Sequence, residues 1–151
     1  MQGIERIRDR VIESFAVDHY VQYRNPALVG GDCGEGIGGD FAVGTNKGLV
    51  RQLPGNKVWL ICGQGRPRRY FLRHWFIVDE VGEVSEAGED GRDGLFRFDA
   101  QGRIGRWFQP PRRLDGLLWF HEFRRVQSNF SFGLNPIAAP FVVEFERLAA
   151  D

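Results

Sequence analysis

Hydrophobic positions follow two different periods along this chain, and each period predicts a different kind of element. Residues 4–15 have apolar side chains at Ile4, Ile7, Val11, Ile12 and Phe15, which is the spacing of one helix face. This pattern predicts an opening helix over residues 3–16. Residues 25–48 contain eight glycines, too much backbone freedom for a regular element in their first half, so residues 30–39 are expected to form an exposed loop.

The middle of the chain has the runs typical of strands. Residues 57–63 are a β-branched and apolar run between glycines, and residues 69–84 stay apolar or alternate long enough for one extended strand. Residues 95–108 are expected to form two short strands around a glycine turn. A further short strand is expected at residues 40–46, followed by a short helix or turn at 48–53 and a Pro-Gly turn.

The last third of the chain mixes helix and strand signals. The two prolines in residues 109–113 cannot occupy a central strand. Residues 114–127 then predict a short helix, with Asp115 able to cap it, and residues 141–145 predict a closing strand. Residues 86–94 are acidic and rich in glycine, and we expect a solvated loop there.

The order of these elements sets the expected fold class. With 151 residues, 42% of them hydrophobic, the chain can form one domain with a sizeable core. No alternating βαβ pattern occurs, which argues against a doubly wound nucleotide fold. We therefore expect a single α+β domain over residues 1–151, a small and mostly antiparallel barrel with peripheral helices.

Composition narrows the classes of protein and the compartment. No apolar run approaches the roughly 20 residues of a membrane span, and the charged start has no signal-peptide core, so a cytoplasmic protein is expected. Cys33 and Cys62 are too few and too far apart for a metal motif and are expected to be reduced structural thiols. We expect neither a metal nor a cofactor.

The positive charges are nearly all arginine, and they are clustered. The formal net charge is zero, which argues against bulk coating of nucleic acid but not against a local basic groove. A GC-rich genome alone would produce the arginine bias, and such arginines are more often solvated surface than ligands. As a pair of clusters on loops, they also fit contacts with phosphates. The candidate phosphate-binding residues are Arg66, Arg68, Arg69, Arg73, Arg112 and Arg113.

A resemblance to a known family arises from residues 41–84. The run FAVGTNKGLVRQLPGNKVWLICGQG followed by YFLRHWFIVDEVGEV resembles the EVE domain of the PUA-like superfamily in its order of strand, short helix, turn and two further strands. Asn46 agrees with the family pattern, whereas Phe41 stands where tryptophan is usual and Thr45 where arginine is usual. The segment WFHEFRRVQSNFSFGLNPI is similar to PUA-like modules attached to HNH-type nucleases of modification-dependent restriction systems.

This resemblance implies a pseudo-barrel whose pocket accepts a nucleobase, often a modified or flipped one, in DNA or RNA. The resemblance also points to a nuclease partner that another chain would supply. A flipped base requires aromatic rings that stack on it and amide groups that form hydrogen bonds with its edge. The sequence contains both kinds of group. The candidate base-binding residues are Asn46, Trp75, Trp107, Trp119, Asn129, Ser131, Phe132 and Asn135.

Competing interpretations stay open at this point. Most of the aromatic residues must belong to the core of a domain of this size. Phe130 and Phe132 could pack inward while Asn129 and Asn135 satisfy a turn. The alternatives to a nucleic-acid-binding module are a small ribonuclease that uses His74 or His121 with arginines, and a domain that binds a protein partner without any ligand. The three histidines are far apart in sequence, and no catalytic motif accompanies them, so no catalytic residue is assigned.

Overall fold

The computed structural model describes residues 17–24, 39–83, 96–130 and 133–150. These residues form a mixed α+β structure, which confirms the expected class. The predicted helix at residues 3–16 and the predicted loop at 86–94 lie outside the described residues, as does the predicted loop at 30–39 except for its last residue. The elements in chain order are β1 (His19–Arg24), β2 (Phe41–Thr45), η1 (Gly48–Gln52), β3 (Lys57–Gln64), β4 (Arg69–Ile77), β5 (Glu80–Glu83), β6 (Phe98–Gly102), β7 (Gly105–Arg113), α3 (Leu118–Val126), η2 (Ser128–Phe130), β8 (Asn135–Pro136) and α4 (Ala139–Ala149).

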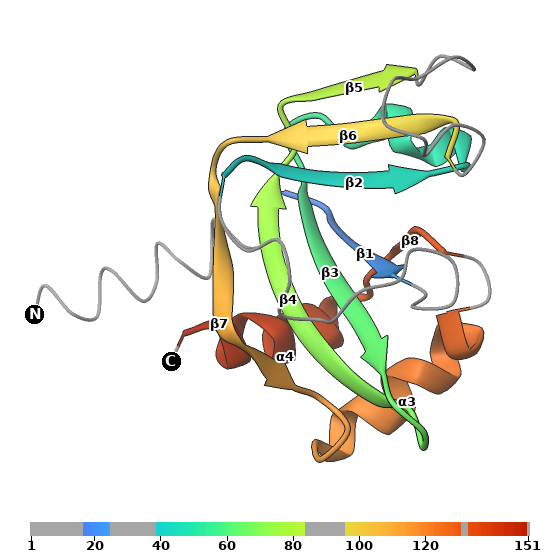
Figure 1. Ribbon diagram of the computed structural model, residues 1–151, viewed down its shortest axis with the longest axis vertical. Coiled ribbons are helices and arrows are strands. Elements are labelled where there is room, and N and C mark those ends of the chain that lie inside the picture. The colour runs from blue at the N-terminus through green and yellow to red at the C-terminus, as the bar shows by residue number, and fades with distance from the viewer. Residues whose placement is uncertain (1–16, 25–38, 84–95, 131–132, 151) are drawn as a thin grey trace, which may run out of the picture.

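The strands form two separate sheets (Figure 1). The larger sheet has the order β7-β4-β3-β1-β8, and the smaller has the order β2-β6-β5. Every pairing is antiparallel except that of β1 with β3. In Figure 1 the three-stranded sheet lies across the top, and the five-stranded sheet runs down from it with α3 and α4 at its lower half. Within the described residues the two sheets do not close into a barrel.

Each face of the five-stranded sheet packs on a different partner. Successive side chains of a strand point to opposite faces. Trp59 and Leu72 therefore join the core under the helices, with Phe120 and Phe145 from α3 and α4. Leu60 belongs to the other core, formed against the three-stranded sheet. The strands at the centre of the sheet are buried on both faces, which explains the continuous apolar run of β3.

A sharp corner links the two sheets. The chain leaves β6 at the left of Figure 1 and turns down into β7. Gly102 and Gly105 stand at this corner, where a Cβ atom on either would run into the backbone oxygen of Ile77 or Trp75. Glycine is therefore required by close backbone approach. The two strands predicted in residues 95–108 are thus confirmed, but they belong to different sheets.

Two strand predictions need correction. Residues 69–84 are not one strand, because the chain leaves β4 after Ile77 and β5 joins the other sheet. Two backbone bonds fix this departure: Val78 N–H donates to Asn56 O at 2.9 Å, and Asp79 N–H donates to Gln101 O at 2.8 Å. The strand at His19–Arg24 was not predicted at all, because it is too short and mixed to show a pattern of its own.

The two prolines lie inside a strand rather than in a break. Strand β7 extends through Pro110 and Pro111 to Arg113. It forms an edge of the five-stranded sheet, with β4 as its neighbour. An edge position tolerates residues that lack an N–H group, so the exclusion of these prolines from a central strand was right.

The C-terminal third contains two helices. Helix α3 confirms the helix predicted at residues 114–127, but its N-cap is Leu117, without a side-chain cap. Asp115 instead accepts a backbone bond from Tyr70 at 3.2 Å. The closing strand predicted at residues 141–145 is wrong, since these residues belong to α4. Buried Val142 and Phe145 are three residues apart, so helical packing against the core overrides their β-propensity.

The expectation of reduced cysteines is wrong for Cys62, which is disulfide-bonded. Cys33 lies outside the described residues. Disulfide bonds are rare in the cytoplasm, so this bond does not support the compartment expected from the sequence. Among the described residues no helix is long and apolar enough to cross a membrane.

Candidate nucleic-acid interface

The two predicted arginine clusters meet at one end of the five-stranded sheet. Arg66, Arg68 and Arg69 belong to the β3–β4 hairpin, and the β4–β7 pairing sets Phe71 opposite Arg113 and Leu72 opposite Arg112. Residues more than 40 positions apart in the chain thereby become neighbours. Helix α3 adds Arg124, whose guanidinium lies 4.3 Å from the centre of the Tyr70 ring. We call the set of Arg66, Arg68, Arg69, Arg112, Arg113 and Arg124 the arginine end.

The arginine end lies away from the three-stranded sheet. Figure 1 shows the β3–β4 hairpin, the end of β7 and α3 together at the bottom of the molecule, with the three-stranded sheet at the top. Arg66, Arg68, Arg69 and Arg113 are exposed, and Arg112 and Arg124 are half-buried. Within the described residues Asp115 forms an ion pair with this set, its carboxylate lying 2.8 Å from Arg113. The local charge is therefore strongly positive although the chain as a whole is neutral.

The aromatic layer beneath these arginines fixes their position. Tyr23 stacks on Phe130 with ring centres 5.0 Å apart, and Tyr70 packs on Phe130 at 5.9 Å. Arg124 lies over this layer and donates to the amide oxygen of Asn129 at 3.0 Å. An arginine held over a ring keeps its planar head in place, which lowers the entropy cost of binding an anion.

Charge and burial shift pKa values at this end, and the hydrogen bond with Asp115 raises that of Arg113. Burial raises the pKa of Tyr23, and the nearby Arg68 and Arg124 oppose that rise. A hydrogen bond from Arg113 holds the pKa of Asp115 below its usual range. These groups keep their ordinary charge at neutral pH, so the positive field of the arginine end is stable across the physiological range.

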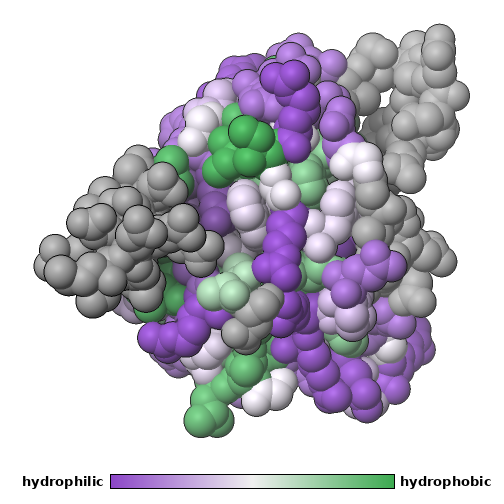
Figure 2. Space-filling model, turned by 90° about the vertical axis from the view of Figure 1, so that its left-hand side faces the viewer, coloured by the Kyte–Doolittle hydropathy of each residue, from purple (hydrophilic) through white to green (hydrophobic). Residues whose placement is uncertain are grey.

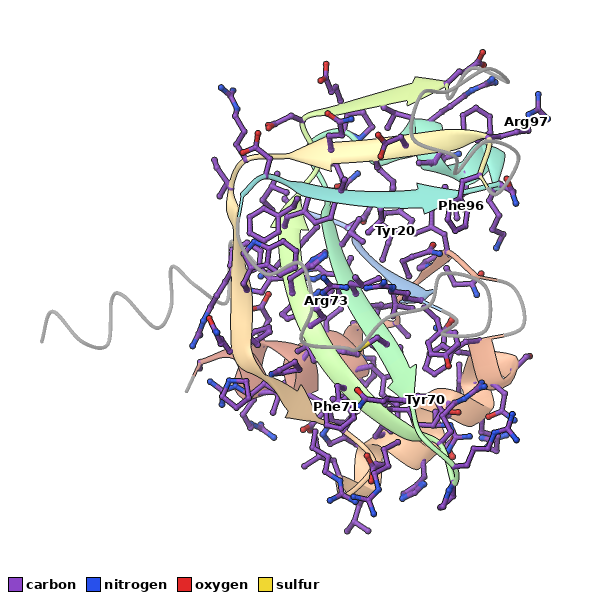
Figure 3. The ribbon with its side chains drawn as sticks, in the orientation of Figure 1. Tyr20, Tyr70, Phe71, Arg73, Phe96 and Arg97 are labelled. Carbon is purple, nitrogen blue, oxygen red and sulfur yellow. The ribbon has the colours of Figure 1, made fainter. Side chains whose placement is uncertain are left out.

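A hollow of about 300 Å³ opens at the turn of the hairpin, lined by Gln64, Gly65, Arg66, Pro67, Arg69 and Phe71. Gly65 has φ +82°, a conformation that favours glycine and closes the turn. Phe71 is half-buried, and it points to the sheet face opposite Tyr70 and Leu72, both of which join the core under the helices. Figure 3 labels Tyr70 and Phe71 toward the lower end of β4.

The predicted base-binding residues do not meet around one cavity. Trp75 and Trp119 pack at the core under the helices, whereas Trp107 packs at the core between the sheets. The five-stranded sheet separates the two sets. Trp107 stacks on Phe41 with centres 5.0 Å apart, and Trp119 packs on Phe145 at 5.0 Å.

The predicted amides are equally dispersed and have structural contacts. Asn46 accepts a bond from the backbone of Arg97 at 2.8 Å, and Asn129 accepts one from Arg124. Asn135 accepts a 2.8 Å bond from Lys47 Nζ. Ser131 and Phe132 lie outside the described residues.

One predicted phosphate-binding residue is not at the arginine end. Arg73 is only 6% exposed, and its guanidinium lies 5.3 Å from the centre of the Trp107 ring (Figure 3). Arg73 lies four residues along β4 from Arg69, toward the core between the sheets, at a β-bulge where Leu60 pairs with His74 and Ile61 with Leu72. The sequence has no signal for this bulge.

The histidines do not form a catalytic pair. His74 is 1% exposed, and burial lowers its pKa to about 3. It packs on Trp107 with ring centres 4.6 Å apart, between the two sheets. His121 is exposed on α3, which covers the other face of the five-stranded sheet. This geometry gives no support to a ribonuclease that uses both histidines.

Sequence reasoning missed three features of this end and one elsewhere. Phe71, Gln64 and Arg124 lie at the arginine end, and their only signal was their place beside a hairpin or among other arginines. The fourth is Lys57, whose Nζ lies 2.6 Å from Glu146 Oε1 and 3.9 Å from the centre of the Trp75 ring. Burial lowers the pKa of Lys57, opposed by Glu146. This ion pair fastens α4 to the sheet.

The surface on the β7 side is mostly hydrophilic. Figure 2, which looks onto this side, shows hydrophobic residues in separate patches among hydrophilic ones. The large exposed hydrophobic side chains of the described residues are spread out: Ile104 lies between β6 and β7, Leu118 and Val126 at the two ends of α3, and Val143 on α4. Such scattered residues are normal and do not mark a protein-binding face.

No family model matches this chain, and no curated protein matches its sequence.

Proposed function

We propose that this chain is a nucleic-acid-binding module and that its arginine end contacts the phosphate backbone. The observation that carries the proposal is the meeting of two arginine clusters, distant in sequence, on one end of the five-stranded sheet. Exposed arginines on a hairpin and at a strand end are able to follow a row of phosphates, and each guanidinium can hold a phosphate with two bonds.

The proposal includes the expected PUA-like architecture and the recognition of a modified or flipped base. It places no base between Trp107 and Trp119, because the sheet lies between these side chains. The ring that accompanies the arginine end is that of Phe71, in the hairpin hollow.

The two alternatives have less support. A ribonuclease would use His74 or His121 as a general base. His74 is buried and neutral, and the exposed His121 has no second histidine beside it, because His74 lies on the other side of the five-stranded sheet and His19 is buried against Trp59. A domain that binds a protein partner would be expected to show a contiguous apolar patch, whereas the exposed apolar side chains of the described residues are scattered.

Salt dependence is the direct test. Fluorescence anisotropy with labelled 20-nucleotide DNA and RNA, single-stranded and duplex, should be measured from about 25 to 200 mM salt. We expect affinity to fall steeply as salt rises, with a slope near 0.9 for each duplex phosphate that is neutralised. The double variant Arg66→Gln/Arg69→Gln should lower that slope by about two and weaken binding to every sequence alike.

A matched control removes two arginines from the opposite end of the molecule. Arg51→Gln/Arg103→Gln takes away two exposed cations that pair with Glu83 and Asp79 near the three-stranded sheet. It leaves the same net charge as the test variant and should bind as the wild type does. Equal losses in both variants would show bulk electrostatics rather than a defined surface, and absence of binding at the lowest salt would refute the proposal.

A further inference from the structure

The hairpin hollow combines the groups that an unpaired nucleotide requires. Phe71 contributes a half-buried ring, Gln64 an amide, and Arg66 and Arg69 two exposed cations, all within one hollow of about 300 Å³. The volume is at the lower limit for small-molecule sites, which suits one base with its phosphate rather than a larger ligand.

The orientation of Phe71 sets it apart from the other rings at this end. Tyr70 packs on Phe120 at 5.5 Å and Phe130 at 5.9 Å within the core. Phe71 is the next residue along β4 and points to the opposite face, where the hollow opens. Phe71 keeps part of its ring exposed and lines the hollow. One of its faces is therefore accessible to a planar group that enters the hollow.

The polar groups are placed to hold both parts of a nucleotide. The exposed amide of Gln64 has two donors and two acceptor lone pairs, which are the groups that the edge of a base requires. Arg66 lies within the turn that joins β3 to β4, Arg69 begins β4 directly after it, and both line the hollow with Phe71. A base stacked on Phe71 would thus have its phosphates within the positive field of the arginine end.

On these grounds we propose that the hairpin hollow is a site for one unpaired nucleotide, with its base stacked on Phe71, and that the module prefers single-stranded nucleic acid to duplex. This inference rests on the proposed nucleic-acid binding and adds to it a preference for single strands. Bases in a duplex are paired and stacked on one another, so they reach a ring in a surface hollow only after extrusion. Stacking on aromatic side chains is the usual sequence-tolerant contact with single strands.

The test compares a 12-nucleotide single strand, the duplex of the same sequence, and a single strand with abasic sites. Each is titrated at low salt with wild type, Phe71→Leu, Phe71→Tyr and, as a control, Ile104→Ala at the exposed corner between β6 and β7. We expect wild type to bind the normal single strand most tightly. Phe71→Leu should weaken that binding on the order of tenfold.

Three further results are expected. Phe71→Tyr keeps a ring and should retain the affinity, whereas Phe71→Leu should bind the normal strand about as weakly as wild type binds the abasic strand. The salt slope of Phe71→Leu should equal that of wild type, because no cation is removed. Ile104→Ala should change nothing. Circular dichroism of each variant separates loss of binding from loss of fold.

The outcomes distinguish the inference from the proposed function. If Arg66→Gln/Arg69→Gln weakens binding while Phe71→Leu binds the single strand as wild type does, the nucleotide site is refuted and nucleic-acid binding stands. Equal wild-type affinity for the normal and abasic strands would refute the site in the same way. If wild type binds none of the three at low salt, the proposed function fails, and this inference fails with it.

Discussion

Acidification should destabilise the fold through His74. The imidazole is 1% exposed, with the ring centres of Trp107, Phe41 and Phe76 at 4.6, 5.4 and 5.6 Å. Burial lowers its pKa to about 3, whereas the unfolded chain has the ordinary value near 6.5.

The sign of the effect follows from which state binds the proton. Between pH 6.5 and pH 3 the unfolded chain protonates His74 and the folded chain does not, so stability falls as the pH falls. The stabilisation is complete above pH 6.5. At pH 5 the loss is about 1.5 pH units times 1.36 kcal/mol, or about 2 kcal/mol. The lowered pKa values of Asp115 and Glu122 act from their ordinary values of 3.8 and 4.5 downward, which is below pH 5.

Urea unfolding at pH 7, 6 and 5, followed by tryptophan fluorescence, measures this loss directly. The variant His74→Phe keeps a ring among Phe41, Phe76 and Trp107, and it removes no hydrogen bond to Nδ1, which has none in the described structure. His19 and His121 are present in both proteins. Between pH 7 and pH 5 the unfolding free energy of wild type should fall by about 2 kcal/mol more than that of the variant. A wild type whose unfolding free energy stays constant over this range, or a variant that loses as much, would refute the reasoning.

Two further predictions concern the packing that holds the sheets and helices together. Gly102→Ala places a Cβ against the backbone oxygen of Ile77 and should lower the unfolding free energy by about 1–3 kcal/mol or more in thermal or urea unfolding, whereas Gly48→Ala, with open space around it, should have little effect. Lys57→Met removes one partner of the Lys57–Glu146 pair and should cost about 1–3 kcal/mol, less than a fully buried pair because Glu146 is 30% exposed. The double variant Lys57→Met/Glu146→Leu should recover most of that loss, and a double variant as unstable as the two single losses added together would show that the pair is not coupled.

The sequence by itself determined the elements whose pattern is local. The apolar run of β3 and the helical spacing of α3 were readable because burial imposes a period on consecutive residues. The two clusters of arginines were equally visible. The pattern was misleading at α4, where β-branched and aromatic residues also satisfy a helix face.

Only the tertiary structure decided which residues meet. The β4–β7 pairing brings the two arginine clusters to one end, and packing against Trp107 between the sheets keeps Arg73 out of them. The alternation of a strand sends Tyr70 into the core and Phe71 to the hairpin hollow. Trp107 and Trp119 are separated by a sheet whose order no local pattern encodes. Contacts between distant segments depend on strand pairing and register, and these are set by the packing of the whole chain rather than by any one stretch of it.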